Sequence, residues 1–258
     1  MKIHPKSKFV MIGDSITDCG RSRRVHGEEA LGSGYVRLVN SLLAAAYPQL
    51  RVQIVNRGIS GNTIRDLKNR WQSDVLDLAP DWLSVMIGIN DVWRNIDNWM
   101  PNEGQISIKE YEDTLDELIG SASPSLKGLV LMTPYLLQPD RSDEMRNMMD
   151  RFGAKVQKMA NKYDATFVDT QAVFDDFLMN SNVDDLSEDR VHLNLTGHMI
   201  LARISQSFME FGMMEIISIY VVQLGIFFPE LQKKCLFVNG TLMETVYGIE
   251  QHQQKFVK

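Results

Sequence analysis

Four short segments of the sequence carry residue types that together can break an ester bond. Between them they supply a serine, a histidine, aspartates, and glycine and asparagine residues. A serine hydroxyl becomes a nucleophile when a neighbouring base takes its proton, and the resulting intermediate needs N–H donors for its oxyanion. The segments therefore indicate acyl transfer through a serine. They are GDSI (13–16), GISGN (58–62), GIND (88–91) and DRVH (189–192).

Five residues in these segments suit the roles that this chemistry requires. Ser15 is the candidate nucleophile, and His192 is the candidate base. Asp189 precedes His192 by three residues, so a short turn can bring its carboxylate to the imidazole and stabilise the protonated ring. Three donors are expected to bind the oxyanion: the backbone N–H of Ser15, the unobstructed backbone N–H of Gly61, and the side-chain NH₂ of Asn90.

Taken alone, each segment is a weak signal. Gly-Asp-Ser also occurs in turns at strand ends, and Asp-x-x-His also occurs at helix caps and on surfaces. Gly61 and Asn90 suit ordinary turns. An aspartate and a histidine can also ligate a metal, but no further cluster of His, Cys or Glu in the sequence supports that interpretation, and no metal is expected. The order of the four segments, each at the end of a predicted element, makes the combination specific.

The elements that must position these segments alternate along the chain. Short apolar runs predict buried strands, and helical spacing of apolar residues predicts the helices between them. The expected strands are Lys8–Ile12, Val52–Asn56, Trp82–Ile87, Gly128–Thr133 and Ala165–Asp169. The expected helices are Gly34–Tyr47, Thr63–Leu78, Ile108–Ser121, Ser142–Tyr163, Gln171–Asn180 and Leu195–Phe211. Ser142 is expected to cap the fourth of these helices.

This alternation implies βαβ units and therefore a mostly parallel, five-stranded sheet with helices on both faces. The expected fold is an α/β protein, a three-layer α/β/α sandwich of the flavodoxin-like kind. Ligands of such a sheet bind beyond the carboxyl ends of its strands. Ser15, Gly61 and Asn90 follow the first three expected strands, so we predict that they meet at this edge.

Other side chains near these segments are candidates for contact with a substrate. Trp93 and Arg94 follow the third segment closely, and an indole ring can pack on the C–H face of a sugar. Tyr135 ends the fourth strand at the same edge. A packing role is the alternative for these side chains. Asp14 is expected to be structural, because adjacent side chains on an extended segment point to opposite faces. His198 lies in a helical pattern and is also expected to be structural.

Composition and charge narrow the class of protein. The 258 residues are 44% hydrophobic and carry a formal net charge of −6. These values suit one soluble domain and give no reason to expect nucleic acid or a membrane as partner. Cys19 and Cys235 match no disulfide framework, so a cytoplasmic location is expected. The first apolar run, Phe9–Ile12, is shorter than a secretory signal requires.

On these residues the sequence resembles the SGNH/GDSL hydrolases, which are named for the Ser, Gly, Asn and His of four blocks. The letters fall on Ser15, Gly61, Asn90 and His192, with Asp189 as the acid, and the similarity spans residues 8–210. The segments GDSITDCGR, NRGISGNTIRDLK, MIGINDVWR and DRVH look like those of intracellular esterases that deacetylate xylo-oligosaccharides. The resemblance implies the SGNH hydrolase fold, a Ser-His-Asp mechanism through an acyl-serine, no cofactor, and an acetylated sugar as substrate.

The resemblance ends close to the last expected helix. We therefore divide the chain into a hydrolase domain, residues 1–212, and a C-terminal extension, residues 213–258. Met213–Phe228 in the extension is strongly apolar. We expect it to form an extra strand or helix that packs on the domain or on a partner subunit, because a membrane span needs about 20 apolar residues. The sequence leaves homo-oligomer formation open.

Two alternatives to a short-chain esterase remain. Related folds accept longer acyl chains, so a lysophospholipase or thioesterase is the alternative within the enzymes. A flavodoxin-like or carbohydrate-binding module would use the same sheet edge without catalysis. A phosphate-binding module is disfavoured, since Asp14 puts a carboxylate at the first turn, where it would repel phosphate.

Overall fold

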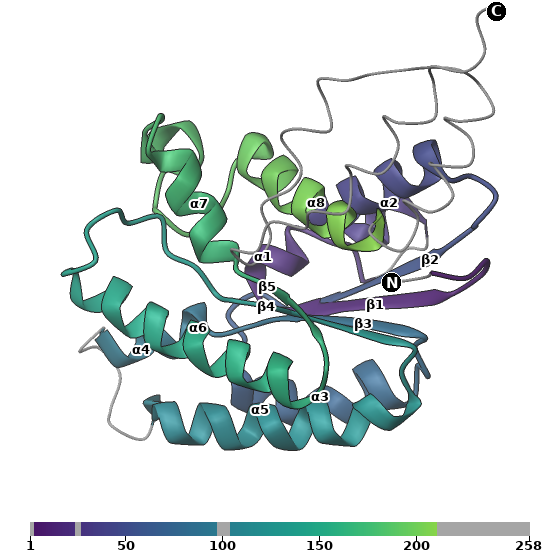
Figure 1. Cartoon of the computed structure of the whole chain (residues 1–258), viewed down its shortest axis with the longest axis horizontal. Coiled ribbons are helices and arrows are strands. Elements are labelled where there is room, and N and C mark those ends of the chain that lie inside the picture. The colour runs from purple at the N-terminus through teal and green to yellow at the C-terminus, as the bar shows by residue number, and fades with distance from the viewer. Residues whose placement is uncertain (1–2, 24–26, 97–103, 211–258) are drawn as a thin grey trace, which may run out of the picture. The chain divides into compact units, whose positions relative to one another are not determined.

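The computed structural model describes residues 3–23, 27–96 and 104–210, and all structural statements concern these residues. Its centre is a five-stranded sheet in the order β2-β1-β3-β4-β5, with every strand pair parallel (Figure 1). The strands are β1 (Lys8–Gly13), β2 (Gln53–Gly58), β3 (Trp82–Met86), β4 (Gly128–Met132) and β5 (Thr166–Val168).

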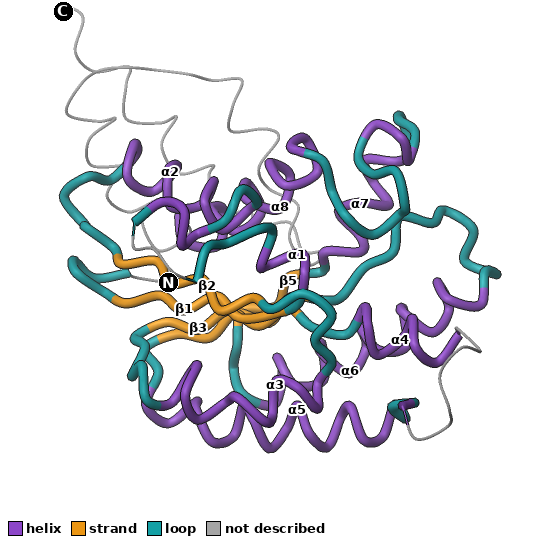
Figure 2. The backbone as a smooth tube through the Cα atoms, turned by 180° about the vertical axis from the view of Figure 1, so that it is seen from behind, coloured by secondary structure: helices purple, strands orange, loops and turns teal. Residues whose placement is uncertain are grey.

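Helices cover both faces of the sheet, so the three-layer α/β/α fold is confirmed. The ribbon and the tube place α1, α2, α7 and α8 on one face, and α3, α4, α5 and α6 on the other (Figures 1 and 2). The helices are α1 (Ser15–Asp18), α2 (Tyr35–Ala46), α3 (Ile64–Trp71), α4 (Ile89–Ile96), α5 (Ile108–Ala122), α6 (Glu144–Lys162), α7 (Thr170–Leu178) and α8 (Leu195–Glu210).

The burial of the strands explains why their sequences are continuous apolar runs. All residues of β3, and all but the first of β1 and β4, are buried, because these strands are covered by helices on both faces. β2 lies at the edge of the sheet and alternates between buried and more exposed positions. The core is therefore built around the three central strands, which carry two of the loops of interest.

The register of the sheet brings the ends of three strands to one level. Gly13, the last residue of β1, pairs with Gly58 at the end of β2 and with Met86 at the end of β3. β2 lies on one side of β1, and β3 lies on the other side, so the strand order reverses at β1. Since ligand sites of open α/β sheets lie where the strand order reverses, the loops after β1, β2 and β3 frame the expected site.

Two short helices at this edge, α1 and α4, were not predicted. Each begins directly at one of the segments of interest, and neither exceeds eight residues, which is too short for a clear helical periodicity. The expected cap at Ser142 is wrong. Asp143 caps α6 instead by accepting a hydrogen bond from Arg146 N at 2.9 Å, while the Ser142 hydroxyl donates to Asp140 Oδ1 at 2.7 Å.

In the part of the chain that the structure describes, no helix combines the length and apolar character needed to cross a membrane. The expected extension, residues 213–258, lies outside the described residues. The boundary at residue 212 and the packing of Met213–Phe228 therefore stay predictions.

Candidate active site

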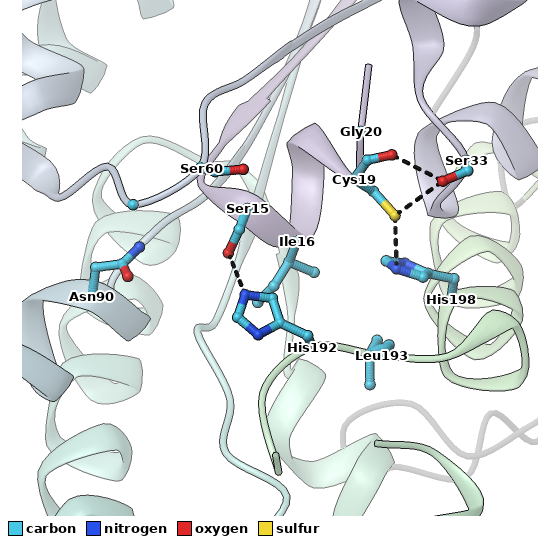
Figure 3. A pocket seen from close by; sticks show the side chains of 11 residues that line it. Ser15, Ile16, Cys19, Gly20, Ser33, Ser60, Asn90, His192, Leu193 and His198 are labelled. Atoms are coloured by element: carbon cyan, nitrogen blue, oxygen red, sulfur yellow. Dashed lines mark hydrogen bonds between the residues drawn. The ribbon is translucent and has the colours of Figure 1, made fainter. Parts of the chain in front are cut away.

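Ser15 and His192, which are 177 positions apart in the sequence, are joined by a hydrogen bond. Ser15 is the first residue of α1, and its Oγ lies 3.0 Å from His192 Nε2 (Figure 3). On the other side of the ring, His192 Nδ1 lies 2.6 Å from Asp189 Oδ2. The three side chains form one continuous hydrogen-bonded series from carboxylate to hydroxyl.

Asp189 is held as an ionised carboxylate. Partial burial acts to raise its pKa, but hydrogen bonds from the His192 ring, from the backbone N–H groups of His192 and Val191, and from the Ser187 hydroxyl outweigh this effect. The pKa of Asp189 therefore lies well below its usual value. Because an ionised carboxylate only accepts, His192 Nδ1 carries the proton, and Nε2 is left as the acceptor for the Ser15 hydroxyl.

The loop that carries His192 is anchored to the end of β4 from within the protein. The hydroxyl of Tyr135 donates to Val191 O at 2.8 Å, and Leu137 N donates to Arg190 O at 2.9 Å. Tyr135 is fully buried, so its predicted contact with substrate is wrong. Its hydroxyl instead fixes the residue next to His192, an effect that its position at the strand end alone did not reveal.

The three expected oxyanion donors are grouped around Ser15. Gly61 has a φ of +78°, a conformation that favours glycine, and Asn90 lies in the first turn of α4. Among the described residues, neither Ser15 N–H nor Gly61 N–H donates to another protein group. Asn90 Nδ2 donates to Asn62 O at 2.9 Å, which uses one of the two N–H bonds of its amide. Each of the three groups thus keeps one N–H available.

These groups open into a common cavity of about 540 Å³. Figure 3 shows Asn90 on one side of Ser15, and Cys19 with His198 on the other. The cavity is lined by Ser15, Ile16, Cys19, Gly20, Ser33, Ser60, Gly61, Asn90, His192, Leu193 and His198. The four residue types singled out from the sequence therefore meet at one cavity, as the strand ends predicted.

His198 has the structural role expected of it, and it also contributes to the cavity wall. Its Nδ1 accepts a hydrogen bond from Tyr35 N at 3.2 Å, and its Nε2 lies 3.2 Å from Cys19 Sγ. Burial lowers the pKa of His198 to about 4, so the ring is neutral near neutral pH. With Nδ1 accepting, Nε2 must carry the proton and donate it to sulfur.

Trp93 and Arg94 do not line the cavity. The Arg94 guanidinium donates to Gly61 O at 2.8 Å, so it contacts the backbone of an expected oxyanion donor. Trp93 is partly exposed beside it on α4. Their contact with a substrate stays a prediction. Ser60 was missed as a lining residue, because nothing in its local sequence indicates which way it faces.

Two aspartates next to the site residues are buried. Asp14 caps α1 by accepting from Ile16 N at 3.0 Å, which confirms its expected structural role. Asp91 Oδ1 accepts from Ile64 N at 3.0 Å, while its Oδ2 has no hydrogen-bond partner among the described residues. Burial raises the pKa of each carboxyl to about 7. Both groups therefore bind a proton more tightly in the folded protein than in the unfolded chain.

The buried carboxyl of Asp91 leads to a prediction about stability and pH. Its unfolded pKa is about 3.9, and its folded pKa is about 7. Proton binding by Asp91 therefore stabilises the folded state fully at a pH below the unfolded pKa. This contribution to the free energy of unfolding is lost as the pH rises through about 7. Asp91→Asn does not titrate and keeps an acceptor for Ile64 N–H. We expect the variant to gain stability relative to the wild type between about pH 5 and about pH 8, measured by urea unfolding. A difference that stays constant with pH would contradict this.

Comparison with known proteins agrees with this geometry. The model of the GDSL-like Lipase/Acylhydrolase family matches residues 11–200. A curated acetylxylan esterase of Geobacillus stearothermophilus is 50% identical over 206 residues, which are 79% of this chain and 94% of that protein.

Solved structures of esterases and hydrolases are similar to this chain in both fold and sequence. The crystal structure of Axe2, an acetylxylan esterase from Geobacillus stearothermophilus, is similar with a TM-score of 0.76 and 49% identity, over 79% of this chain and 94% of that one. LAE5, an alpha/beta hydrolase enzyme from the metagenome of Lake Arreo, has a TM-score of 0.77 and 44% identity, over 79% and 95% of the two chains. Structures of Axe2 described as catalytic mutants have a serine, an aspartate or a histidine replaced by alanine.

Proposed function

The chain belongs to the GDSL-like lipase/acylhydrolase family, and we propose that it is a serine esterase that removes acetyl groups from acetylated xylo-oligosaccharides. The observation that carries the reaction type is the hydrogen-bonded series from Asp189 through His192 to Ser15. Asp189 holds the ring proton of His192 on Nδ1, and Nε2 therefore carries no proton. The site is thus ready to take the serine proton.

The proposed reaction proceeds in two halves. Ser15 Oγ attacks the ester carbonyl carbon as His192 Nε2 takes its proton. The tetrahedral intermediate collapses when His192 gives that proton to the leaving sugar oxygen, and an acetyl-serine remains. Water then attacks the acetyl-serine, again with His192 as base, and acetate leaves as Ser15 regains its proton. Asp189 stays ionised throughout and stabilises the protonated ring.

Negative charge develops on the carbonyl oxygen in both halves. We assign its stabilisation to Ser15 N–H, Gly61 N–H and the second N–H of the Asn90 amide. Such donors are effective because they are oriented before the charge appears, and the loss of one typically costs about 3–4 kcal/mol of transition-state stabilisation. The bond from Asn90 to Asn62 O holds the amide in one orientation.

The substrate class is supported by the similarity to an acetylxylan esterase, which extends over almost all of that relative. The alternative of a longer acyl chain is not favoured by the comparisons, since the relatives that cover this chain include acetyl esterases. The cavity that contains Ser15 also has serine hydroxyls and glycines in its wall, which leave polar surface near the ester.

Acyl-chain profiling tests the substrate class. We expect kcat/KM to be highest for p-nitrophenyl acetate and to fall by about tenfold or more toward the octanoyl ester, in keeping with the similarity to acetylxylan esterases. Acetylated xylo-oligosaccharides are expected to release acetate, which chromatography can quantify. Activity that rises from acetyl to octanoyl would instead favour the lysophospholipase or thioesterase alternative.

The cellular location and the oligomeric state of the protein are also proposals. We place the enzyme in the cytoplasm, in keeping with its two cysteines and the absence of a disulfide framework in the sequence. Association of copies of the chain into a homo-oligomer is left as a prediction, to be measured by sedimentation of the full chain.

A further inference from the structure

We propose that Asp18 is a positioning residue that links the nucleophile to an oxyanion donor. It joins the helix of Ser15 to the loop of Gly61. The proposal rests on the proposed esterase function, and it gives a role to an aspartate of the GDSITD segment that the hydrolytic chemistry itself does not use.

Asp18 is the last residue of α1, one helical turn after Ser15. Its buried carboxylate reaches across to the loop after β2. There, Oδ2 accepts two hydrogen bonds from Ser60, one from the backbone N at 3.0 Å and one from Oγ at 3.1 Å. The carbonyl of Ser60 forms the peptide bond that carries Gly61 N–H. Fixing both the backbone and the side chain of Ser60 therefore limits how that peptide can rotate.

The carboxylate can reach Ser60 because α1 packs directly on the end of β2. A Cβ on Gly58 would lie 2.1 Å from Asp18 N, so only glycine permits this approach. Asn56 Nδ2 donates to Thr17 O at 2.7 Å, and Arg21 Nε donates to Gly58 O at 2.7 Å. These contacts tie α1 and the segment that follows it to β2, which makes Asp18 a rigid point of attachment.

The loop is held on its other side by a different helix. Arg94 on α4 donates to Gly61 O at 2.8 Å, and Asn62 N donates to Ile59 O at 3.2 Å. Gly61 has a positive φ and no side chain to restrain it, so its amide direction depends on these outside contacts. Among the side chains of neighbouring helices that bind this loop, only that of Asp18 belongs to the helix that carries Ser15.

The charge of Asp18 strengthens this attachment. A carboxylate accepts stronger hydrogen bonds than a neutral group does. Arg21 Nε at 3.9 Å and the Arg23 guanidinium at 3.7 Å lie close enough to balance the buried charge. Because oxyanion donors act mainly on the transition state, loosening Gly61 should lower kcat and leave substrate binding nearly unchanged.

The test compares Asp18→Ala and Asp18→Asn with the wild type, using p-nitrophenyl acetate and a count of active sites from the acylation burst. We expect Asp18→Ala to lower kcat per active site by about 10- to 100-fold, with KM within about twofold. Asp18→Asn keeps an acceptor for Ser60 N–H but not the charge, so we expect a smaller loss of about fivefold. Affinity for a small boronic acid, which forms a tetrahedral adduct on Ser15, should fall in parallel with kcat/KM.

Asp140→Ala is the matched control. Asp140 Oδ1 accepts from both the backbone N and the Oγ of Ser142, at 2.8 and 2.7 Å, yet neither residue lines the cavity. The Asp140→Ala variant should therefore have the kcat of the wild type. Wild-type kcat per active site in Asp18→Ala would overturn the proposal, as would a rise in KM alone. If only Asp18→Asn folds, wild-type kcat in that variant overturns it. The esterase function is tested separately, by whether the wild type hydrolyses the ester and Ser15→Ala does not. An Asp18 variant with unchanged kcat therefore contradicts only the role of Asp18.

Discussion

Ser15→Ala is expected to abolish ester hydrolysis while the protein stays folded. The variant removes the only atom that can form the acyl-enzyme in the proposed mechanism, and it removes the partner of His192 Nε2. In a triad that works as a unit, loss of the nucleophile costs about 10⁶-fold in kcat. The remaining oxyanion donors leave a residual rate above that of water alone.

The measurement combines steady-state hydrolysis of p-nitrophenyl acetate with covalent labelling by a serine-directed organophosphonate. Both signals should disappear in Ser15→Ala, and the thermal transition should remain. Ser33→Ala is the matched control, because Ser33 lines the same cavity but its hydroxyl donates to Cys19 O at 3.0 Å. Labelling that persists in Ser15→Ala, or that is lost in Ser33→Ala, would refute the assignment of the nucleophile.

Asp189→Asn is expected to lower kcat by about 10⁴-fold without disrupting the fold. The carboxylate accepts the Nδ1 proton of His192 at 2.6 Å, and this contact keeps Nε2 free of a proton. An amide in its place can turn its NH₂ group toward Nδ1. The ring then takes the other tautomer, with the proton on Nε2, and it can no longer accept the proton of Ser15.

The control for this variant is Asp185→Asn, four residues earlier in the same loop. Asp185 Oδ2 accepts from Asn182 N at 2.9 Å and from Ser181 Oγ at 3.0 Å, without contact to His192. We expect the control to retain activity within about threefold, as a surface substitution does. The comparison measures kcat at one pH and the thermal melting temperature for the wild type, Asp189→Asn and Asp185→Asn. Equal losses in the two variants would show that the loop, rather than the carboxylate beside the imidazole, is responsible.

The sequence alone was enough for the fold class and for the five residues of the proposed site. The central strands are buried on both faces, so their apolar runs stand out from the helical spacing around them. Parallel strands bring their carboxyl ends to one edge, and this places Ser15, Gly61 and Asn90 together. Residue type then indicates the chemistry, because few combinations of side chains can supply a nucleophile, a base and oxyanion donors.

Only the tertiary structure decided where the supporting side chains point. Tyr135 lies at the expected strand end but turns inward to Val191 O, and Arg94 turns to Gly61 O. Asp18 reaches Ser60, which lies 42 positions further along the chain. The direction of such a side chain depends on which distant backbone packs against it, and local propensity carries no information about that contact. The sequence therefore determined which groups we propose to react, and packing between distant segments decided what holds them in place.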